Sequence, residues 1–290
     1  MPDMPRSQCP SCAYAGARPS LMLDNGRFIA FCPSCDIGYT CPPRQETELI
    51  NYYANTFYNS HMMHFDADRV HVFAADFRRV SRGLTKGALL DFGCGFGHFI
   101  RLAVDRGWDA KGVDVAGQVV RIAREELHLD VRQGGVEAIG AWGIRFEMVT
   151  LWNVLDHLRD PAAILRELRG VLADRGRIVL RIHNFGIRKI VFRLGRSLRI
   201  PFLQNNFALF LDCCFTAATI RRILRRSGYR NIVVRNSSLA ADVKGRQLGK
   251  SILGIIQCCL SAAYYITFGS ACLGPSLLVT AEKGSGELHE

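Results

Sequence analysis

From residue 85 to residue 235, short apolar runs alternate with stretches in which apolar residues recur every three or four positions. The first pattern is typical of buried β-strands and the second of amphipathic α-helices. Their alternation predicts an α/β fold, with a doubly wound and mostly parallel sheet between layers of helices. The expected strands are Ala88–Phe92, Ala110–Val113, Val131–Arg132, Phe146–Trp152, Arg177–Ile182 and Asn231–Val234, and the expected helices are His98–Arg106, Gln118–Leu127, Ala162–Leu172 and Ala217–Arg226.

A different pattern occupies residues 1–42. The pairs Cys9-Pro-Ser-Cys12 and Cys32-Pro-Ser-Cys35 flank a turn signal, Asp24-Asn25-Gly26, and a strand-like run, Phe28–Phe31. Each pair offers two thiolates, and a tetrahedral zinc ion requires two such pairs. A redox pair is the alternative, but the repeat favours a zinc ribbon whose closed shell stabilises the fold. The expected ligands of Zn²⁺ are Cys9, Cys12, Cys32 and Cys35.

Residues 43–84 form an expected helical linker or lid before the alternating region. Apolar residues at helical spacing predict a helix over Arg69–Val80, after a stretch rich in aromatic and histidine residues. The remaining paired cysteines, Cys213-Cys214 and Cys258-Cys259, lie in apolar runs and are expected in the core. No apolar secretory signal occurs near the start, so we expect reduced thiols and a cytoplasmic protein.

The charge of the chain is local. Lys and Arg number 37 and Asp and Glu 26, which gives a formal net charge of +11 over 290 residues. Between Arg175 and Arg235, however, 14 Lys and Arg accompany one acid, Asp212, so this segment carries +13 and the rest −2. Such an excess favours an anionic partner, which includes nucleic acid, a membrane surface or a phosphorylated substrate. An apolar content of 49% excludes a disordered chain.

The most informative stretch is Asp91-Phe-Gly93-Cys94-Gly95-Phe-Gly97, between a predicted strand and a predicted helix. Glycines let the backbone turn sharply and approach a ligand. Position 98 is His, where the dinucleotide fingerprint requires Gly. Asp91 beside the loop suits a cation, and Asp114, at the end of the next strand, is placed to accept both hydroxyls of a ribose. These features predict a positively charged adenosine ligand, and S-adenosylmethionine is such a compound.

With these motifs the chain resembles the class I S-adenosylmethionine-dependent methyltransferases over about residues 85–235. Leu89–Gly97 is similar to their first motif and Lys111–Asp114 to their second. Gln133–Glu137 resembles the segment that lines the adenine, and Phe146–Asp160 the fourth strand and its loop. The resemblance implies a seven-stranded Rossmann-like sheet, and a cofactor held by Asp91, Gly93, Cys94, Gly95, Gly97, Asp114, Val115, Gly135, Val136, Trp152 and Asn153.

Candidates for a general base follow the fourth and fifth strands, whose carboxyl ends face the ligand crevice. His157 follows the fourth strand, and an imidazole suits this role near neutral pH. Asp156 would orient it or contact the substrate, and His183 ends the fifth strand. His61 and His64 lie where such enzymes often carry a lid and are candidates for acceptor contact. The alternative for each histidine is a packing or capping role.

Two C-terminal segments point towards a membrane surface. Ile187–Ile200, within an expected basic insertion at about 186–212, has apolar residues at helical spacing and no acid, which is typical of a membrane-surface helix. Residues 251–281 carry no charge, but interrupting glycines and Pro275 favour a buried or interfacial helix at about 251–273 over a span. Pro275–Ala281 is expected to return as the last antiparallel strand of a methyltransferase domain over 85–290.

The leading prediction is therefore a methyltransferase for a small-molecule, sugar or lipid-linked acceptor. The N-terminal ribbon resembles that of a bacterial subgroup that often methylates sugars, lipids or other secondary metabolites. The alternatives are an RNA methyltransferase that grips phosphates with the basic segment, and a non-catalytic S-adenosylmethionine-binding module. Asn153-Val-Leu-Asp156 lacks the Asn-Pro-Pro-Tyr and Pro-Cys sequences used on nucleobases, so nucleic acid is the less favoured partner.

Overall fold

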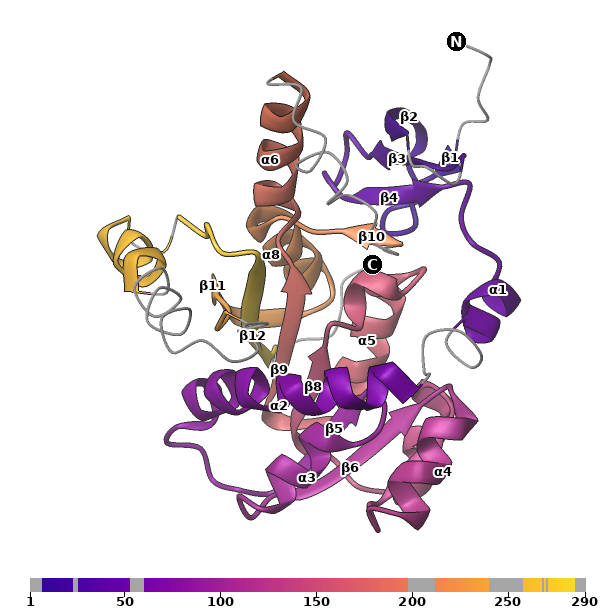
Figure 1. Cartoon of the computed structure of the whole chain (residues 1–290), viewed down its shortest axis with the longest axis vertical. Coiled ribbons are helices and arrows are strands. Elements are labelled where there is room, and N and C mark those ends of the chain that lie inside the picture. Colours follow the sequence, from indigo (N-terminus) through magenta and orange to yellow (C-terminus); the bar gives the residue numbers. More distant parts are fainter. Residues whose placement is uncertain are drawn as a thin grey trace.

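The larger of two sheets has seven strands, in the order β11-β12-β9-β8-β5-β6-β7 (Figure 1). The computed structural model describes residues 7–22, 26–52, 60–197, 212–239, 258–267, 269 and 271–284. Pairing is parallel from β7 to β9, whereas β12 runs antiparallel to both β9 and β11. The doubly wound, mostly parallel sheet is confirmed. Its strands are β5 (Ala88–Phe92), β6 (Asp109–Asp114), β7 (Val131–Gln133), β8 (Phe146–Trp152), β9 (Leu172–His183), β11 (Tyr229–Asn236) and β12 (Ser276–Lys283).

Helices cover both faces of this sheet. Apolar side chains of α2 (Ser60–Ser81), α3 (His98–Val104) and α4 (Gly117–Glu125) pack on one face. Those of α5 (Pro161–Val171) and α8 (Ala217–Arg226) pack on the other. Two 3₁₀ turns, η2 (Val136–Trp142) and η3 (Leu155–His157), follow β7 and β8.

Local capping explains where two of the helices begin. The side chain of Asp160 accepts a hydrogen bond from the Ala163 amide at 2.9 Å, and Thr216 accepts one from Thr219 at 3.1 Å. After α8, Gly228 takes up a left-handed φ of 81°, a conformation that favours glycine at a helix end. These caps, which depend on a few residues, match the predicted positions of the last helix.

The lid segment is more helical than the sequence indicates. α2 starts at Ser60, nine residues before the predicted start at Arg69, and α1 (Glu46–Asn51) precedes it. The apolar residues of the first turns of α2 lack clean helical spacing, so periodicity could not detect them. His61 and His64 therefore lie on a helix, at positions whose side chains fall outside the described part of the structure.

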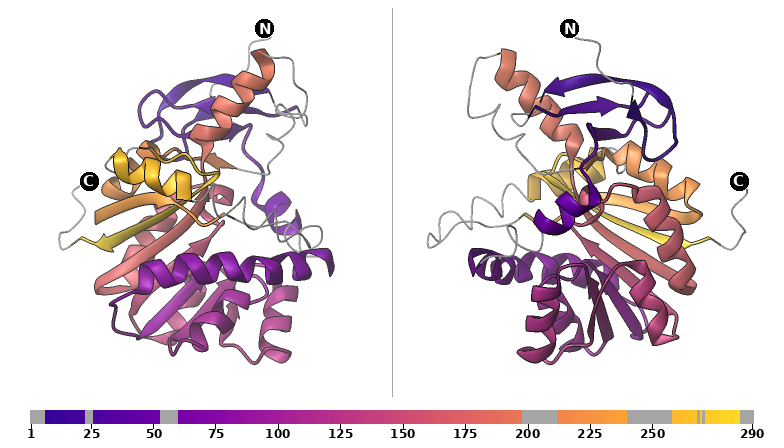
Figure 2. Two further views of the ribbon diagram at one scale, coloured as in Figure 1. Left: turned by 60° about the vertical axis from the view of Figure 1, so that its left-hand side comes forward. Right: turned by 90° about the vertical axis from the view of Figure 1, so that its right-hand side faces the viewer.

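The N-terminal sheet contains β1 (Ser7–Gln8), β2 (Ala15–Met22), β3 (Phe28–Phe31) and β4 (Gly38–Cys41). A fifth strand, β10 (Cys213–Cys214), comes from the other end of the chain and pairs with β4. The sequence did not reveal this pairing, because a two-residue strand has no periodicity. It seats the ribbon beside α6 (Phe185–Ser197) at one end of the large sheet (Figure 2).

The base of α6 packs against the ribbon. The rings of Phe31 and Phe185 lie 5.6 Å apart, and the Lys189 ammonium lies 4.4 Å from the Phe31 ring centre. The remainder of α6 extends away from the sheet (Figure 2), and Ile190 is 54% exposed. The expected helix at 187–200 is thus present over its described part, which ends at Ser197.

The C-terminal apolar segment differs from its prediction. Residues 258–266 are helical, but Tyr265 and Ile266 are 65% and 77% exposed. Cys258 and Cys259 are exposed as well, so their predicted place in the core is wrong, whereas Cys213 and Cys214 are buried as predicted. This helix lies at the margin of the molecule (Figure 1), where little protein covers it. In the described ranges, no helix has the length and apolar character needed to cross a membrane.

Candidate functional site

Three glycines shape the loop between β5 and α3. Gly93, Gly95 and Gly97 have left-handed φ values of 76°, 52° and 78°. The amides of Gly93 and Cys94 both donate to the Val113 carbonyl, at 2.8 and 3.1 Å. A Cβ at Gly93 would lie 2.6 Å from the Val154 side chain. The loop therefore lies in contact with both β6 and the segment that follows β8.

Two buried carboxylates flank the loop. Asp114, at the end of β6, accepts hydrogen bonds from the Gly95 amide at 2.8 Å and the Ala116 amide at 2.9 Å. Asp91, in β5, accepts one from the Thr150 hydroxyl at 2.7 Å. Carboxylate oxygens accept more than one hydrogen bond, so Asp114 retains capacity for ligand hydroxyls.

The electrostatics of this pair favour a cation. Burial raises the pKa of Asp91 to about 7, the Thr150 hydrogen bond opposes the shift, and the charge of Asp114 adds to it. A positive ligand would relieve the cost of two nearby buried carboxyl groups. The donor set and the glycine cradle thus fit the sulfonium and ribose of S-adenosylmethionine.

The other residues predicted for cofactor binding lie in different surroundings. Val115 is 45% exposed at the end of β6, and Val136 packs partly buried on the core. The Gly135 amide donates to Glu137 at 2.6 Å. Asn153 follows β8 directly, in a left-handed conformation with φ 58°.

Trp152 packs more deeply than expected for a residue that lines a pocket. It is 8% exposed, and its ring lies 5.1 Å from Phe73 of α2 and 4.8 Å from Phe99 of α3. Its indole nitrogen meets no hydrogen-bond acceptor among the described residues. Trp152 therefore links the end of β8 to the helices above it.

The three predicted catalytic residues come together at the carboxyl ends of β8 and β9. Oδ2 of Asp156 accepts hydrogen bonds from the His183 amide at 2.7 Å and pairs with His183 Nδ1 at 2.6 Å. The rings of His157 and His183 are perpendicular, with centres 6.5 Å apart. Asp156 is 1% exposed. Asp156 therefore orients His183, whereas the sequence analysis paired it first with His157.

This arrangement keeps the Asp156 carboxylate charged. Burial raises its pKa, but the hydrogen bonds and charge of His183, with the charge of His157, outweigh burial and leave the pKa below its usual range. Oδ1 is buried and accepts no hydrogen bond from the described residues. A charged carboxylate at Nδ1 fixes the proton on that nitrogen and leaves Nε2 as the basic position.

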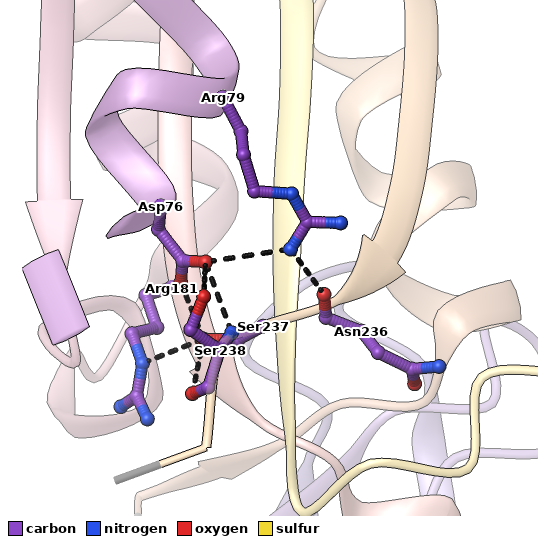
Figure 3. A network of polar contacts seen from close by, with 6 residues as sticks. All are labelled: Asp76, Arg79, Arg181, Asn236, Ser237 and Ser238. Atoms are coloured by element: carbon purple, nitrogen blue, oxygen red, sulfur yellow. Dashed lines mark hydrogen bonds and ion pairs between the residues drawn. The ribbon is translucent and has the colours of Figure 1, made fainter. Parts of the chain in front are cut away.

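A second polar network joins α2 to the same edge of the sheet (Figure 3). Arg181 of β9 donates from Nη1 to Asn153 at 2.6 Å and from Nε to the Ser237 hydroxyl at 2.9 Å. The Ser237 and Ser238 hydroxyls donate to Asp76 at 2.5 and 2.7 Å. Asp76 is fully buried. The network fixes α2 over the ends of β8 and β9.

Sequence reasoning missed the roles in this network. Its one visible signal is Arg181, a charged residue within an otherwise apolar strand. Asp76 and Ser237 are 161 positions apart, so nothing in the sequence connects them.

The ribbon brings its four cysteines together. Their sulfur atoms all lie within 4.8 Å of one another, with Cys9 and Cys35 at 3.5 Å and Cys12 and Cys32 at 3.5 Å. A tetrahedral zinc ion with Zn–S bonds of about 2.3 Å separates its sulfurs by about 3.8 Å. The cluster thus fits one zinc ion bound by four thiolates.

The two knuckles have the same backbone geometry. The Cys9 amide bonds to Tyr14 and the Ala13 amide to Cys9, and Cys32, Asp36 and Ile37 repeat this pattern. Ala13 and Asp36 have left-handed φ values of 56° and 64°. The hydrogen bond from Cys9 lowers the pKa of Cys35 to about 5, which favours the thiolate that a metal requires.

Comparison with known proteins agrees with this geometry. Residues 58–234, more than half of the chain, match the family model described as a methyltransferase domain. The chain belongs to this methyltransferase family. Two similar proteins are annotated by name as ubiquinone biosynthesis O-methyltransferases. The one from Cereibacter sphaeroides is 34% identical over 96 residues, covering 31% of this chain and 39% of its own length. The one from Idiomarina loihiensis is 30% identical over 112 residues, covering 37% and 46%.

The chain thus spans less than half of the length of these curated relatives. Solved structures agree on the methyltransferase fold. Magnesium protoporphyrin IX methyltransferase from Synechocystis, with bound SAH, has a TM-score of 0.55 at 15% identity and covers 83% of this chain and 100% of its own. Phosphoethanolamine N-methyltransferase 2 from Haemonchus contortus has a TM-score of 0.52 at 15% identity, covering 86% and 62%.

Proposed function

We propose that the protein transfers a methyl group from S-adenosylmethionine to a small-molecule, sugar or lipid-linked acceptor. The observation that carries this proposal is the Asp156–His183 pair, with its 2.6 Å contact, at the sheet edge that also holds the glycine loop. The methyltransferase family and the O-methyltransferase names of the two relatives support a small-molecule acceptor.

The chain's own groups would hold the cofactor. Bound S-adenosylmethionine supplies a methyl group that is already activated on a positive sulfur. Asp114 would accept the ribose hydroxyls with the oxygen lone pairs that Gly95 and Ala116 leave available. Asp91 would compensate the positive charge, and the absence of a Cβ at Gly93 lets the backbone approach.

His183 would act on the acceptor. Its Nε2 takes the proton of a weakly acidic hydroxyl as the acceptor attacks, and Asp156 stabilises the imidazolium that results. His157, whose ring centre lies 6.5 Å away, would contribute to the wall beside the acceptor. The protein otherwise contributes alignment, since an in-line displacement depends on positioning.

A membrane-surface role is a second component of the proposal. The described part of α6 leaves Ile190 exposed, and its sequence is basic without an acid. Tyr265 and Ile266 add exposed apolar area. Flotation with anionic and neutral liposomes tests this component. We expect binding that depends on anionic lipid, and an absence of binding to both kinds of liposome would contradict it.

The acceptor class is tested by incubating the protein with methyl-labelled S-adenosylmethionine and separate small-molecule, glycan, lipid and RNA fractions of an extract. We expect label in one of the first three fractions. Label confined to RNA would contradict the proposed acceptor class in favour of the RNA alternative. Binding of S-adenosylmethionine without transfer to any fraction would favour a non-catalytic module.

A further inference from the structure

A cavity of about 400 Å³ lies between the ribbon and the loop that carries the catalytic candidates. This volume is within the range of about 300–1,000 Å³ that is usual for small-molecule sites. The ribbon contributes walls of Pro10, Tyr39 and Thr40, and Pro43 follows them. The opposite wall contains Arg159 and Asp212.

The cavity is directly connected to the catalytic edge. The Asp212 amide donates to the carbonyl of Asp156 at 2.9 Å, and the Thr40 amide donates to the carbonyl of Asp212 at 3.0 Å. Arg159 lies two residues after His157 along the same loop. A ligand in the cavity is therefore separated from the Asp156–His183 pair by a single layer of chain.

The charges around the cavity do not balance. The Asp212 carboxylate pairs with Nη1 of Arg44 at 3.3 Å, and both side chains are buried, with 7% and 1% exposed. Arg159 is exposed and forms no ion pair with any residue that the structure describes. Arg27 is matched by Glu48 through two hydrogen bonds, at 2.9 and 2.8 Å. One positive charge therefore remains, at the rim.

The cavity also offers a strong hydrogen-bond acceptor. Burial raises the pKa of Asp212 to about 6, against the charges of Arg44 and Arg27. Near neutral pH this carboxylate can accept hydroxyl protons. Two prolines and the Tyr39 ring provide flat apolar surface beside it, which suits a sugar or aromatic ring.

We propose that this cavity binds the methyl acceptor, a hydroxylated ring compound that carries one phosphate or carboxylate group. The anionic group contacts Arg159 at the rim, and the hydroxyl groups contact Asp212. The inference rests on the proposed methyltransferase function and names the substrate class of that site. It gives the zinc ribbon a role in acceptor recognition.

Saturation-transfer NMR with the zinc-loaded full chain and SAH tests the inference with two matched probe pairs. One pair is glucose 1-phosphate and glucose, and the other is 3,4-dihydroxybenzoate and catechol. We expect the anionic member of at least one pair to bind at least fivefold more tightly than its neutral partner. The pair that discriminates identifies phosphate or carboxylate as the recognised group.

Variants assign the site. Arg159→Gln should reduce the anionic probe to the affinity of its neutral partner, because the unpaired charge is lost. Arg166→Gln, an exposed position on α5 outside the cavity, should leave both affinities unchanged.

An absence of probe binding, equal affinities within both pairs, or retained discrimination in Arg159→Gln would each overturn the inference. Calorimetry with SAH separates this result from the proposed function. SAH binding without probe discrimination would contradict the cavity assignment alone. Probe binding by a chain that does not bind SAH would contradict the proposed function.

Discussion

At the scale of single residues, a few carboxylates determine the chemistry of the site. Asp114 is satisfied by two backbone amides and still faces the glycine loop, whereas Asp91 is buried with one hydroxyl partner. Asp156 is buried and charged because His183 neutralises it. The same residue type thus serves ribose binding, charge compensation and orientation of a base, according to its neighbours.

Replacement of Asp114 by Ala should weaken binding of S-adenosylmethionine by about 10- to 100-fold, since hydrogen bonds to a charged group are each worth about 1.5–3 kcal/mol. Titration calorimetry measures this change. Asp109→Ala, on the same strand but 63% exposed in its side chain, is the matched control. Unchanged affinity in a folded Asp114→Ala protein would show that the ribose lies elsewhere.

The raised pKa of Asp91, about 7, predicts pH-dependent cofactor binding. A cationic ligand favours the ionised form, so affinity should rise about tenfold from pH 6 to pH 8 as this carboxyl loses its proton. The facing titratable groups are Asp114, whose charge raises this pKa, and the Cys94 thiol, which stays protonated because burial raises its own pKa. Asp91→Asn should bind more weakly and without this rise, and an equally steep rise in the variant would refute the assignment.

At the scale of elements, two contacts between distant segments position the site. The Asp76 network attaches α2 to β9 and β11, and the β4–β10 pairing attaches the ribbon to the catalytic domain. Neither element would hold its place by its own propensity. Both attachments depend on pairs of residues that are more than 150 positions apart in the chain.

Asp76→Asn should loosen α2, because a fully buried carboxylate loses its pairing with Arg79, at 3.6 Å, and two serine hydroxyls. We expect a loss of about 1–3 kcal/mol in the free energy of unfolding and faster hydrogen exchange in residues 70–81. Arg78→Gln, at an exposed position on the same helix, provides the comparison. Unchanged exchange in α2 would mean that the network does not fix the helix.

The ribbon should contain one zinc ion per chain, measured by native mass spectrometry. Cys32→Ser should lose the ion and unfold β1 to β4, since structural zinc supplies much of the stability of so small a sheet. Cys258→Ser, at an exposed cysteine, should retain it. Because the glycine loop belongs to the other sheet, binding of SAH should persist in both variants. Full zinc content in Cys32→Ser would exclude a four-cysteine site.

At the scale of the whole molecule, the basic segment is less uniform than its net charge of +13 indicates. Arg181 is buried and bonded to Asn153, and Arg177 pairs with Glu282 at 3.2 Å. These charges hold the fold and are not available to a partner. The charge offered to an acceptor includes Arg159, which lies outside the segment that composition singled out.

The sequence predicted the sheet and the cysteine cluster because strand periodicity, glycine spacing and paired cysteines are local signals. It also predicted that Asp156, His157 and His183 meet, since the ends of adjacent parallel strands share an edge. The first turns of α2, the β10 strand and the Arg181 network depend on contacts between distant residues. The exposed position of Cys258 likewise depends on what packs above it. A single sequence carries no signal for such contacts.

The most direct test of the central claim is methyl transfer from labelled S-adenosylmethionine to a small-molecule extract by wild type, His183→Gln and Asp156→Asn, with SAH affinity measured for each. We predict that both variants bind SAH as wild type does and lose at least 100-fold in transfer rate. Wild-type rates in His183→Gln would contradict the claim that this residue is the base. An absence of transfer by wild type to any acceptor would contradict the claim that the protein is a methyltransferase.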